Sequence, residues 1–219
     1  MLKIKILLRF SDSSFSLMLL HNSYLIYFAY QLKMPFLYLM KKILCFAGSN
    51  SRHSINTILV NYVANKIIDH EVKIISLLDY ELPMYSLDLE NERSFSADLQ
   101  VLRNIIKDHD ALIISVNEHN GSISAFFKNH LDWLSRLDRN FLEGKKVLLM
   151  STSPGARGAK SALEFCKLVL PRFGAEIVES FSFPSFQDNF SIEENKITND
   201  VLEMGLNDML STFEHHINL

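Results

Sequence analysis

The sequence predicts an α/β fold in which five parallel strands, in the order 2-1-3-4-5, form a doubly wound sheet with helices on both faces. Three observations support this fold. From Met40 onward, short apolar runs alternate with segments of helical periodicity. The run 111–116 is almost wholly apolar, as expected of a strand covered on both faces. Hydrophobic residues make up 48% of the 219 residues and charged residues 21%, which indicates a folded globular protein.

The first half of this pattern begins with a strand at 42–47. A helix is expected at 54–70, because six apolar residues fall on one helical face: Ile55, Ile58, Leu59, Tyr62, Val63 and Ile67. The second strand is expected at 71–77. A loop containing Pro83 then covers 82–93, and a second helix covers 94–108.

The second half begins with the strand at 111–116, followed by a helix at 122–137. The fourth strand, 146–151, leads to a helix at 159–170 that ends near Pro171 and Gly174. The fifth strand is expected at 175–181 and the closing helix at 197–213. Because a helical segment separates each strand from the next, the strands are expected to pair in parallel through right-handed crossovers.

The chain divides into residues 1–39, an N-terminal extension of uncertain status, and residues 40–219, a single domain. The extension carries a charge of +3 and leaves −6 for the rest. Its uncharged span 13–32 is a weak membrane-spanning candidate, because it contains His21, Asn22, Ser23, Gln31 and three tyrosines. A secretory signal is also poorly supported, since no small-residue cleavage site follows. We favour a mis-assigned start, because Met40 opens a clean strand.

The composition excludes several classes of function for residues 40–219. No long basic run is present, so we expect no nucleic-acid partner, and we expect no membrane association. Cys45 and Cys166 fall in a predicted strand and helix and form no CxxC pair, which indicates a reducing, cytoplasmic setting. The eight histidines have no metal-site spacing, so we expect no metal.

Four of the seven glycines lie just beyond the carboxyl ends of predicted strands: Gly48, Gly121, Gly155 and Gly158. In a doubly wound sheet, these ends line the crevice in which ligands bind. Glycine lets backbone N–H groups approach a ligand closely. Turn geometry alone could explain one such glycine, but three glycine-containing loops at one edge favour a ligand site.

The first of these loops, residues 48–56, leads into a helix N-terminus, where free N–H groups and the helix dipole favour an anion. Five side chains could complete a phosphate site: Ser49, Ser51, Arg52, Ser54 and Asn56. The loop lacks the Gly-Lys-Ser/Thr of a P-loop and the three glycines of a dinucleotide fingerprint. A single terminal phosphate therefore fits best. Helix capping by Ser54 explains part of the pattern, but not the unbroken polar run from 49 to 54.

The second loop, residues 117–122, contains an Asn120-Gly121 turn whose amides could meet the polar edge of a planar ring. Glu118 and His119 form either a catalytic pair or part of a solvated turn. The third loop, residues 151–158, contains Ser153-Pro154-Gly155 before another helix. Its Arg157 is either a phosphate or substrate contact or a surface charge.

These loops resemble those of the NAD(P)H-dependent FMN reductases of flavodoxin-like fold, which include quinone, azo-dye and chromate reductases. Residues 48–56 are similar to the family's flavin-phosphate loop, residues 118–133 to the segment under the isoalloxazine, and residues 153–158 to its third loop. The likeness spans about residues 40–181. It departs from the family where Ser51 stands at the usual arginine position and Arg52 one place later. Asn117, His119 and Ser124-Ala125 replace a proline, a tyrosine and a Pro-Gly pair.

The resemblance implies FMN as the cofactor, NADPH or NADH as co-substrate, and a quinone-like, azo or other small molecule as electron acceptor. The flavin carries the chemistry, so no protein residue need be catalytic. The resemblance assigns FMN binding to Ser49, Ser51, Arg52, Ser54, Asn56, Glu118, His119, Asn120, Gly121, Ser153, Pro154 and Gly155. It also implies a homodimer or homotetramer, with the helix 128–136 as a candidate contact. The alternative is a flavodoxin-like electron carrier without nicotinamide turnover, which Arg52 and the modest charge disfavour.

Overall fold

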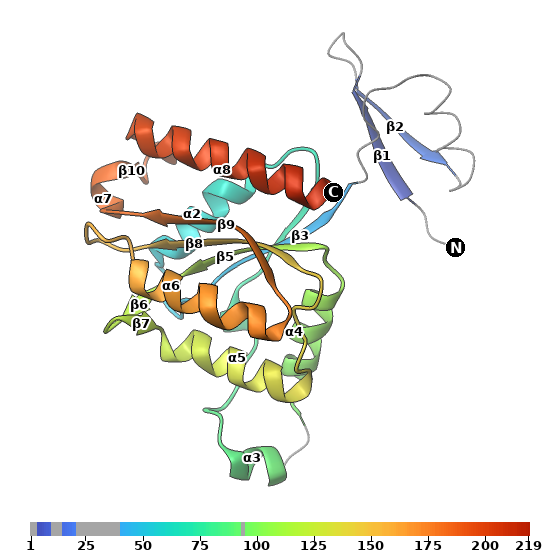
Figure 1. The fold of residues 1–219 in the computed structure, drawn as a ribbon, viewed down its shortest axis with the longest axis vertical. Coiled ribbons are helices and arrows are strands. Elements are labelled where there is room, and N and C mark those ends of the chain that lie inside the picture. The colour runs from blue at the N-terminus through green and yellow to red at the C-terminus, as the bar shows by residue number, and fades with distance from the viewer. Residues whose placement is uncertain (1–3, 10–14, 21–39, 93–94) are drawn as a thin grey trace.

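The computed structural model describes residues 4–9, 15–20, 40–92 and 95–219. Its largest sheet has five strands in the order β4-β3-β5-β8-β9 (Figure 1). These strands are β3 (Lys42–Ala47), β4 (Glu71–Ile74), β5 (Ala111–Val116), β8 (Lys146–Thr152) and β9 (Glu176–Phe183). Each neighbouring pair is parallel. The predicted doubly wound sheet in the order 2-1-3-4-5 is therefore confirmed.

Helices cover both faces of this sheet (Figure 1). On one face lie α2 (Ile55–Ala64) and α8 (Asp200–Asn218), and on the other lie α4 (Ala97–Lys107), α5 (Ala125–Leu137) and α6 (Lys160–Val169). Successive residues of a strand point to opposite faces. Accordingly Ile43 and Cys45 pack with α2 and α8, while Leu44 and Phe46 pack with the other three helices. This double burial explains why the central strands are apolar along their whole length.

Short elements connect these layers. They are η1 (Leu77–Asp79), α3 (Leu87–Glu92), β6 (Glu118–His119), β7 (Ser122–Ile123), η2 (Leu170–Phe173), α7 (Phe186–Asn189), β10 (Phe190–Ser191) and β11 (Lys196–Ile197). In the N-terminal extension, β1 (Ile4–Arg9) pairs antiparallel with β2 (Phe15–Leu20). Most of the span 13–32 that we weighed as a membrane segment lies outside the described residues. None of the helices in the described ranges is long and apolar enough to cross a membrane.

The first predicted helix is shorter than its apolar pattern. α2 ends at Ala64 rather than at residue 70, because the chain must turn back to begin β4, where the Glu71 N–H donates to the Lys41 carbonyl. Ile67 lies beyond the helix end but is still buried in the same core. The apolar spacing in the sequence therefore extends beyond the last hydrogen-bonded turn of α2.

Local pairing also moves other boundaries. α5 begins at Ala125 rather than at residue 122, because Ser122 and Ile123 pair with β6. α8 begins at Asp200, because Ile197 pairs with Phe190 in the β10–β11 hairpin. The predicted loop 82–93 contains the short helix α3.

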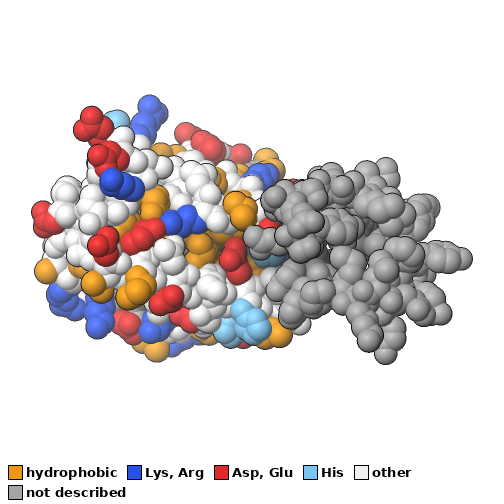
Figure 2. Space-filling model, turned by 90° about the horizontal axis from the view of Figure 1, so that it is seen from above, with side chains coloured by type: hydrophobic (Ala, Val, Ile, Leu, Met, Phe, Trp, Pro, Cys, Tyr) orange, Lys and Arg blue, Asp and Glu red, His pale blue; other side chains and the backbone are white. Residues whose placement is uncertain are grey.

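On the face shown in Figure 2, acidic and basic side chains are interspersed rather than separated by sign.

Candidate functional site

Loop 1, residues 48–54, joins β3 to α2 at the carboxyl edge of the sheet. The Gly48 N–H donates to the Ser115 carbonyl at 2.9 Å. A Cβ at Gly48 would lie 2.8 Å from Cγ of Phe127, so the close approach of α5 requires glycine here. Ser49 Oγ accepts the Ser51 N–H, and Ser51 Oγ accepts the His53 N–H. Side-chain hydrogen bonds therefore shape the turn and leave residues 51–53 exposed.

The loop ends at the N-terminus of α2. Ser54 caps this helix, since its hydroxyl accepts the Thr57 N–H at 3.3 Å, so the capping role considered from the sequence is confirmed. The first turn of α2 contains no acidic residue. Among the described residues, the N–H groups of Asn50, Arg52 and Ser54 have no hydrogen-bond acceptor. Free donors, a helix dipole and the exposed Arg52 guanidinium together suit an anion.

Asn56 lies beneath loop 1 rather than in it. Its side chain is buried, with Oδ1 accepting from the Ser115 hydroxyl at 2.7 Å and from the Thr152 N–H at 3.1 Å. Its Nδ2 donates to the Thr152 carbonyl at 3.1 Å. We predicted Asn56 as a direct FMN contact, but its amide instead joins α2 to the ends of β5 and β8. This is a positioning role, because it fixes loops 1 and 3 relative to one another.

Loop 2, residues 117–124, contains the β6–β7 hairpin. Asn120 and Gly121 form its turn with φ of 50° and 79°, as the tight two-residue hairpin turn requires. Ser124 caps α5 through the Phe127 N–H and donates its own hydroxyl to the Gly48 carbonyl at 2.7 Å. The second bond holds loop 2 directly against loop 1.

In loop 2, His119 is exposed and Asn117 is half-buried. Asn117 Nδ2 is 3.2 Å from His119 Nε2. Asn117 Oδ1 is buried and has no hydrogen-bond partner in the part of the chain that the structure describes. A buried polar atom is normally paired, so this oxygen is suited to a donor supplied by a ligand.

Glu118 contacts α6 rather than His119. Its Oε2 accepts from the backbone N–H groups of Ser161 at 2.9 Å and Ala162 at 3.2 Å. Neither alternative drawn from the sequence, a catalytic pair with His119 or a solvated turn, describes this arrangement. Nothing local in the sequence could have revealed it, because the partners are more than forty residues away.

Loop 3, residues 152–159, is held by its own backbone and by β9. Gly158 has φ of 57°, and a Cβ there would lie 2.8 Å from the Phe183 backbone. The Ser151 hydroxyl donates to the Gly158 carbonyl at 2.6 Å. Ser153 Oγ accepts the Ala159 N–H at 3.1 Å, while Pro154 and Gly155 are exposed. The Arg157 guanidinium donates to Ser161 Oγ and is otherwise exposed, so it remains available to a ligand.

Two buried groups that the sequence analysis did not single out help to hold these loops together. Ser115 is the one polar residue in the apolar run 111–116, and it is fully buried against Asn56. A polar residue in a buried strand requires a partner, and that was the available signal. Thr152 likewise bonds Asn56 and the Phe183 carbonyl. The two described cysteines, Cys45 and Cys166, are buried, so they are not available to a ligand at these loops. Burial raises the pKa of each thiol to about 12.

Three helices begin beside these loops, and their N-termini differ. The N-terminus of α5 is capped by Ser124, and that of α6 by Glu118. An exposed arginine precedes both α2 and α6, namely Arg52 in loop 1 and Arg157 in loop 3. Of these two helix starts in the described residues, that of α6 already binds the Glu118 carboxylate, whereas that of α2 binds none. The arrangement suits a ligand with one terminal phosphate on loop 1 and a planar polar ring near loops 2 and 3. FMN has both features, so the residues present fit this cofactor.

Comparisons with known proteins identify the family of this chain. Residues 41–188 match the family model of the NADPH-dependent FMN reductases. The chain is 30% identical over 134 residues to a quinone reductase of Escherichia coli K12, a match that covers 60% of this chain and 69% of the relative. It is 26% identical over 122 residues to an NADPH azoreductase of Bacillus sp. strain OY1-2, covering 56% of this chain and 64% of the relative.

Solved structures show the same fold. The flavoenzyme NAD(P)H:(acceptor) oxidoreductase of Paracoccus denitrificans superposes with a TM-score of 0.68 at 24% identity, covering 81% of this chain and 97% of the other. An azoreductase of Bacillus anthracis gives a TM-score of 0.52 at 16% identity, covering 82% and 99%. The family match covers more than half of the chain and includes all three loops. The chain therefore belongs to the NADPH-dependent FMN reductase family and is an NAD(P)H-dependent flavin oxidoreductase with FMN as its cofactor.

Proposed function

We propose that this protein uses FMN, held by loops 1 to 3, to pass two electrons from NAD(P)H to a small quinone-like or azo acceptor. Bound FMN supplies the redox chemistry, and the protein supplies binding and orientation. The observation that carries the proposal is the α2 N-terminus, which combines N–H groups that have no acceptor in the described part of the chain, no acidic side chain in its first turn and the exposed Arg52. The acceptor class is supported by the names of the relatives, a quinone reductase and an azoreductase.

The protein's residues divide into those that contact the cofactor and those that hold the contacts in place. Ser49, Ser51, Arg52 and the loop 1 amides would bind the phosphate. The loop 2 segment His119–Gly121 and the loop 3 segment Ser153–Gly155 would border the ring. Ser54, Asn56 and Glu118 support these loops through the hydrogen bonds described above. A cytoplasmic location is part of the proposal, since the reaction consumes NAD(P)H and the described cysteines are free thiols.

The test is direct. Purified protein should be yellow, or become so with added FMN, and boiling should release FMN. NADPH or NADH should be consumed steadily when a benzoquinone or an azo dye is added. An electron carrier would bind FMN but consume no reduced nicotinamide. Protein that stays colourless after reconstitution would refute the proposal, and slow turnover with every acceptor class would refute the acceptor assignment.

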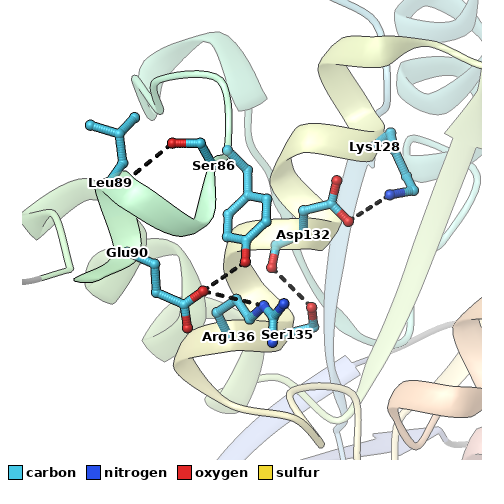
Figure 3. Close-up of polar contacts among 8 residues, drawn as sticks. Ser86, Leu89, Glu90, Lys128, Asp132, Ser135 and Arg136 are labelled. Atoms are coloured by element: carbon cyan, nitrogen blue, oxygen red, sulfur yellow. Dashed lines mark hydrogen bonds and ion pairs between the residues drawn. The ribbon is translucent and has the colours of Figure 1, made fainter. Parts of the chain in front are cut away.

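We propose further that the protein is a homodimer or homotetramer that uses the surface formed by α3 and α5. Lys128 pairs with Asp132 at 2.6 Å, and Arg136 lies 3.4 Å from the Glu90 carboxylate (Figure 3). α3 has no buried residue and extends from the body of the domain (Figure 1), with Leu87 60% exposed. Light scattering should report an oligomer that Leu87→Asp weakens. A monomer at micromolar concentration would contradict this proposal.

A further inference from the structure

Helix α6 begins without a capping side chain of its own. Its N-cap residue is Ala159, which has φ of 61° and makes no side-chain cap hydrogen bond. The first turn of the helix contains no acidic residue. The N–H groups at a helix start have no partner within the helix, so those of α6 depend on other parts of the chain.

Each of these N–H groups finds an acceptor, and the last two find it in loop 2. Ala159 N–H donates to Ser153 Oγ and Lys160 N–H to the Arg157 carbonyl, both within loop 3. Ser161 and Ala162 N–H donate to Glu118 Oε2 at 2.9 and 3.2 Å. A carboxylate in this position also interacts favourably with the helix dipole.

The hairpin that carries Glu118 needs such an anchor. β6 and β7 have two residues each, and an isolated hairpin of this length is not stable in water. Ser124 holds the end of the hairpin against loop 1 through the Gly48 carbonyl. Glu118 holds the other strand against the first turn of α6.

We propose that Glu118 is a positioning residue that fixes loop 2 to the start of α6, directly after loop 3, and so sets where the Asn120-Gly121 turn meets the flavin ring. Its carboxylate also fills the α6 N-terminus, which leaves the α2 N-terminus as the place for the cofactor's phosphate. The effect on the flavin rests on the proposed function. The hydrogen bonds between Glu118 and α6 do not depend on that function.

The experiment compares Glu118→Ala, Glu118→Gln and a control, Ser96→Ala, which removes the cap from α4. FMN affinity is measured by fluorescence titration and stability by the melting temperature. Glu118→Ala should weaken FMN binding by about tenfold or more, and added acetate should restore part of it by filling the vacant helix N-terminus. Glu118→Gln should stay within about threefold of the natural protein, because its amide oxygen still accepts. Ser96→Ala should lower the melting temperature and leave FMN affinity unchanged.

Two results would overturn the proposal: unchanged FMN affinity in Glu118→Ala, or an equal loss of affinity in Ser96→Ala at the same loss of stability. If Glu118→Ala does not fold, hydrogen exchange of the backbone amides in Glu118→Gln tests the proposal instead. Exchange at Ser161 and Ala162 in Glu118→Gln should be faster than in the natural protein, because a neutral amide oxygen is a weaker acceptor than a carboxylate, and unchanged exchange would refute the hydrogen bonds between Glu118 and α6. If the natural protein binds no FMN, the proposed function fails, and the exchange measurement still tests the role of Glu118.

Discussion

Arg52 is an exposed cation in loop 1, next to N–H groups at the start of α2 for which the described residues supply no acceptor. A charge-assisted hydrogen bond contributes about 1–3 kcal/mol, so Arg52→Ala should weaken FMN binding by that amount. Arg52→Lys should lose less, because the charge remains while the planar fork is lost. Fluorescence titration gives both values. Arg172→Ala, an exposed arginine in η2, is the control, and an equal loss there would contradict a specific role for Arg52.

His130 gives a prediction about acid stability. The ring is buried in α5, with Nδ1 2.9 Å from the Phe126 carbonyl, and burial lowers the pKa of this histidine. An unfolded histidine has a pKa of about 6.5, so below that pH the unfolded state binds more protons than the folded state. The free energy of unfolding should therefore fall as the pH falls below about 6.5, with a slope of at most about 1.4 kcal/mol per pH unit from this residue.

Urea unfolding at pH 8 and pH 5.5 checks this effect. His130→Leu should show a smaller difference between the two pH values than the natural protein. Burial also lowers the pKa of His70, so the difference should shrink rather than vanish. The same difference in both proteins would mean that His130 does not contribute.

At the scale of elements, two glycines with positive φ distinguish the energetic cost of backbone strain from that of steric overlap. Gly121 has φ of 79°, and a Cβ there would meet no neighbouring atom within 4 Å, whereas Gly158 has φ of 57° and the Phe183 backbone 2.8 Å away. Gly121→Ala should cost about 1 kcal/mol, the strain of a left-handed alanine. Gly158→Ala should cost about 2 kcal/mol more, because the backbone of β9 must move. Chemical unfolding measures both, and equal costs would contradict this account of loop 3.

The elements show why two central strands, β3 and β5, were easier to predict than helix ends, whereas β4 ends at Ile74, three residues before the predicted 77. The run 111–116 lies between Asp110 and Asn117, and the run 42–47 lies between Lys41 and Gly48. Both runs are buried on both faces apart from Lys42, so their limits are visible in the sequence and were correct. The end of α2 was wrong by six residues, because Ile67 is buried without being helical. The start of α5 was wrong by three residues, because Ser122 and Ile123 pair in a hairpin that has no distinct local pattern.

At the scale of the whole molecule, the sequence predicted which loops meet at one edge of the sheet but not all the roles of their residues. The three loops were predicted from glycines that follow strands, because parallel topology brings those loops to one edge. The roles of Asn56 and Glu118 were not predicted, since each depends on a partner that only the folded chain brings near. Both are side chains that could bind a ligand but instead hold the loops that would.

The central claim is that loop 1 binds the phosphate of FMN. Riboflavin has the same ring without the phosphate, so the ratio of the two dissociation constants tests this claim most directly. Fluorescence titration of the apoprotein should show FMN binding at least about a hundredfold more tightly than riboflavin, and Arg52→Ala should reduce that ratio. Equal affinities for the two flavins in the natural protein would contradict the account.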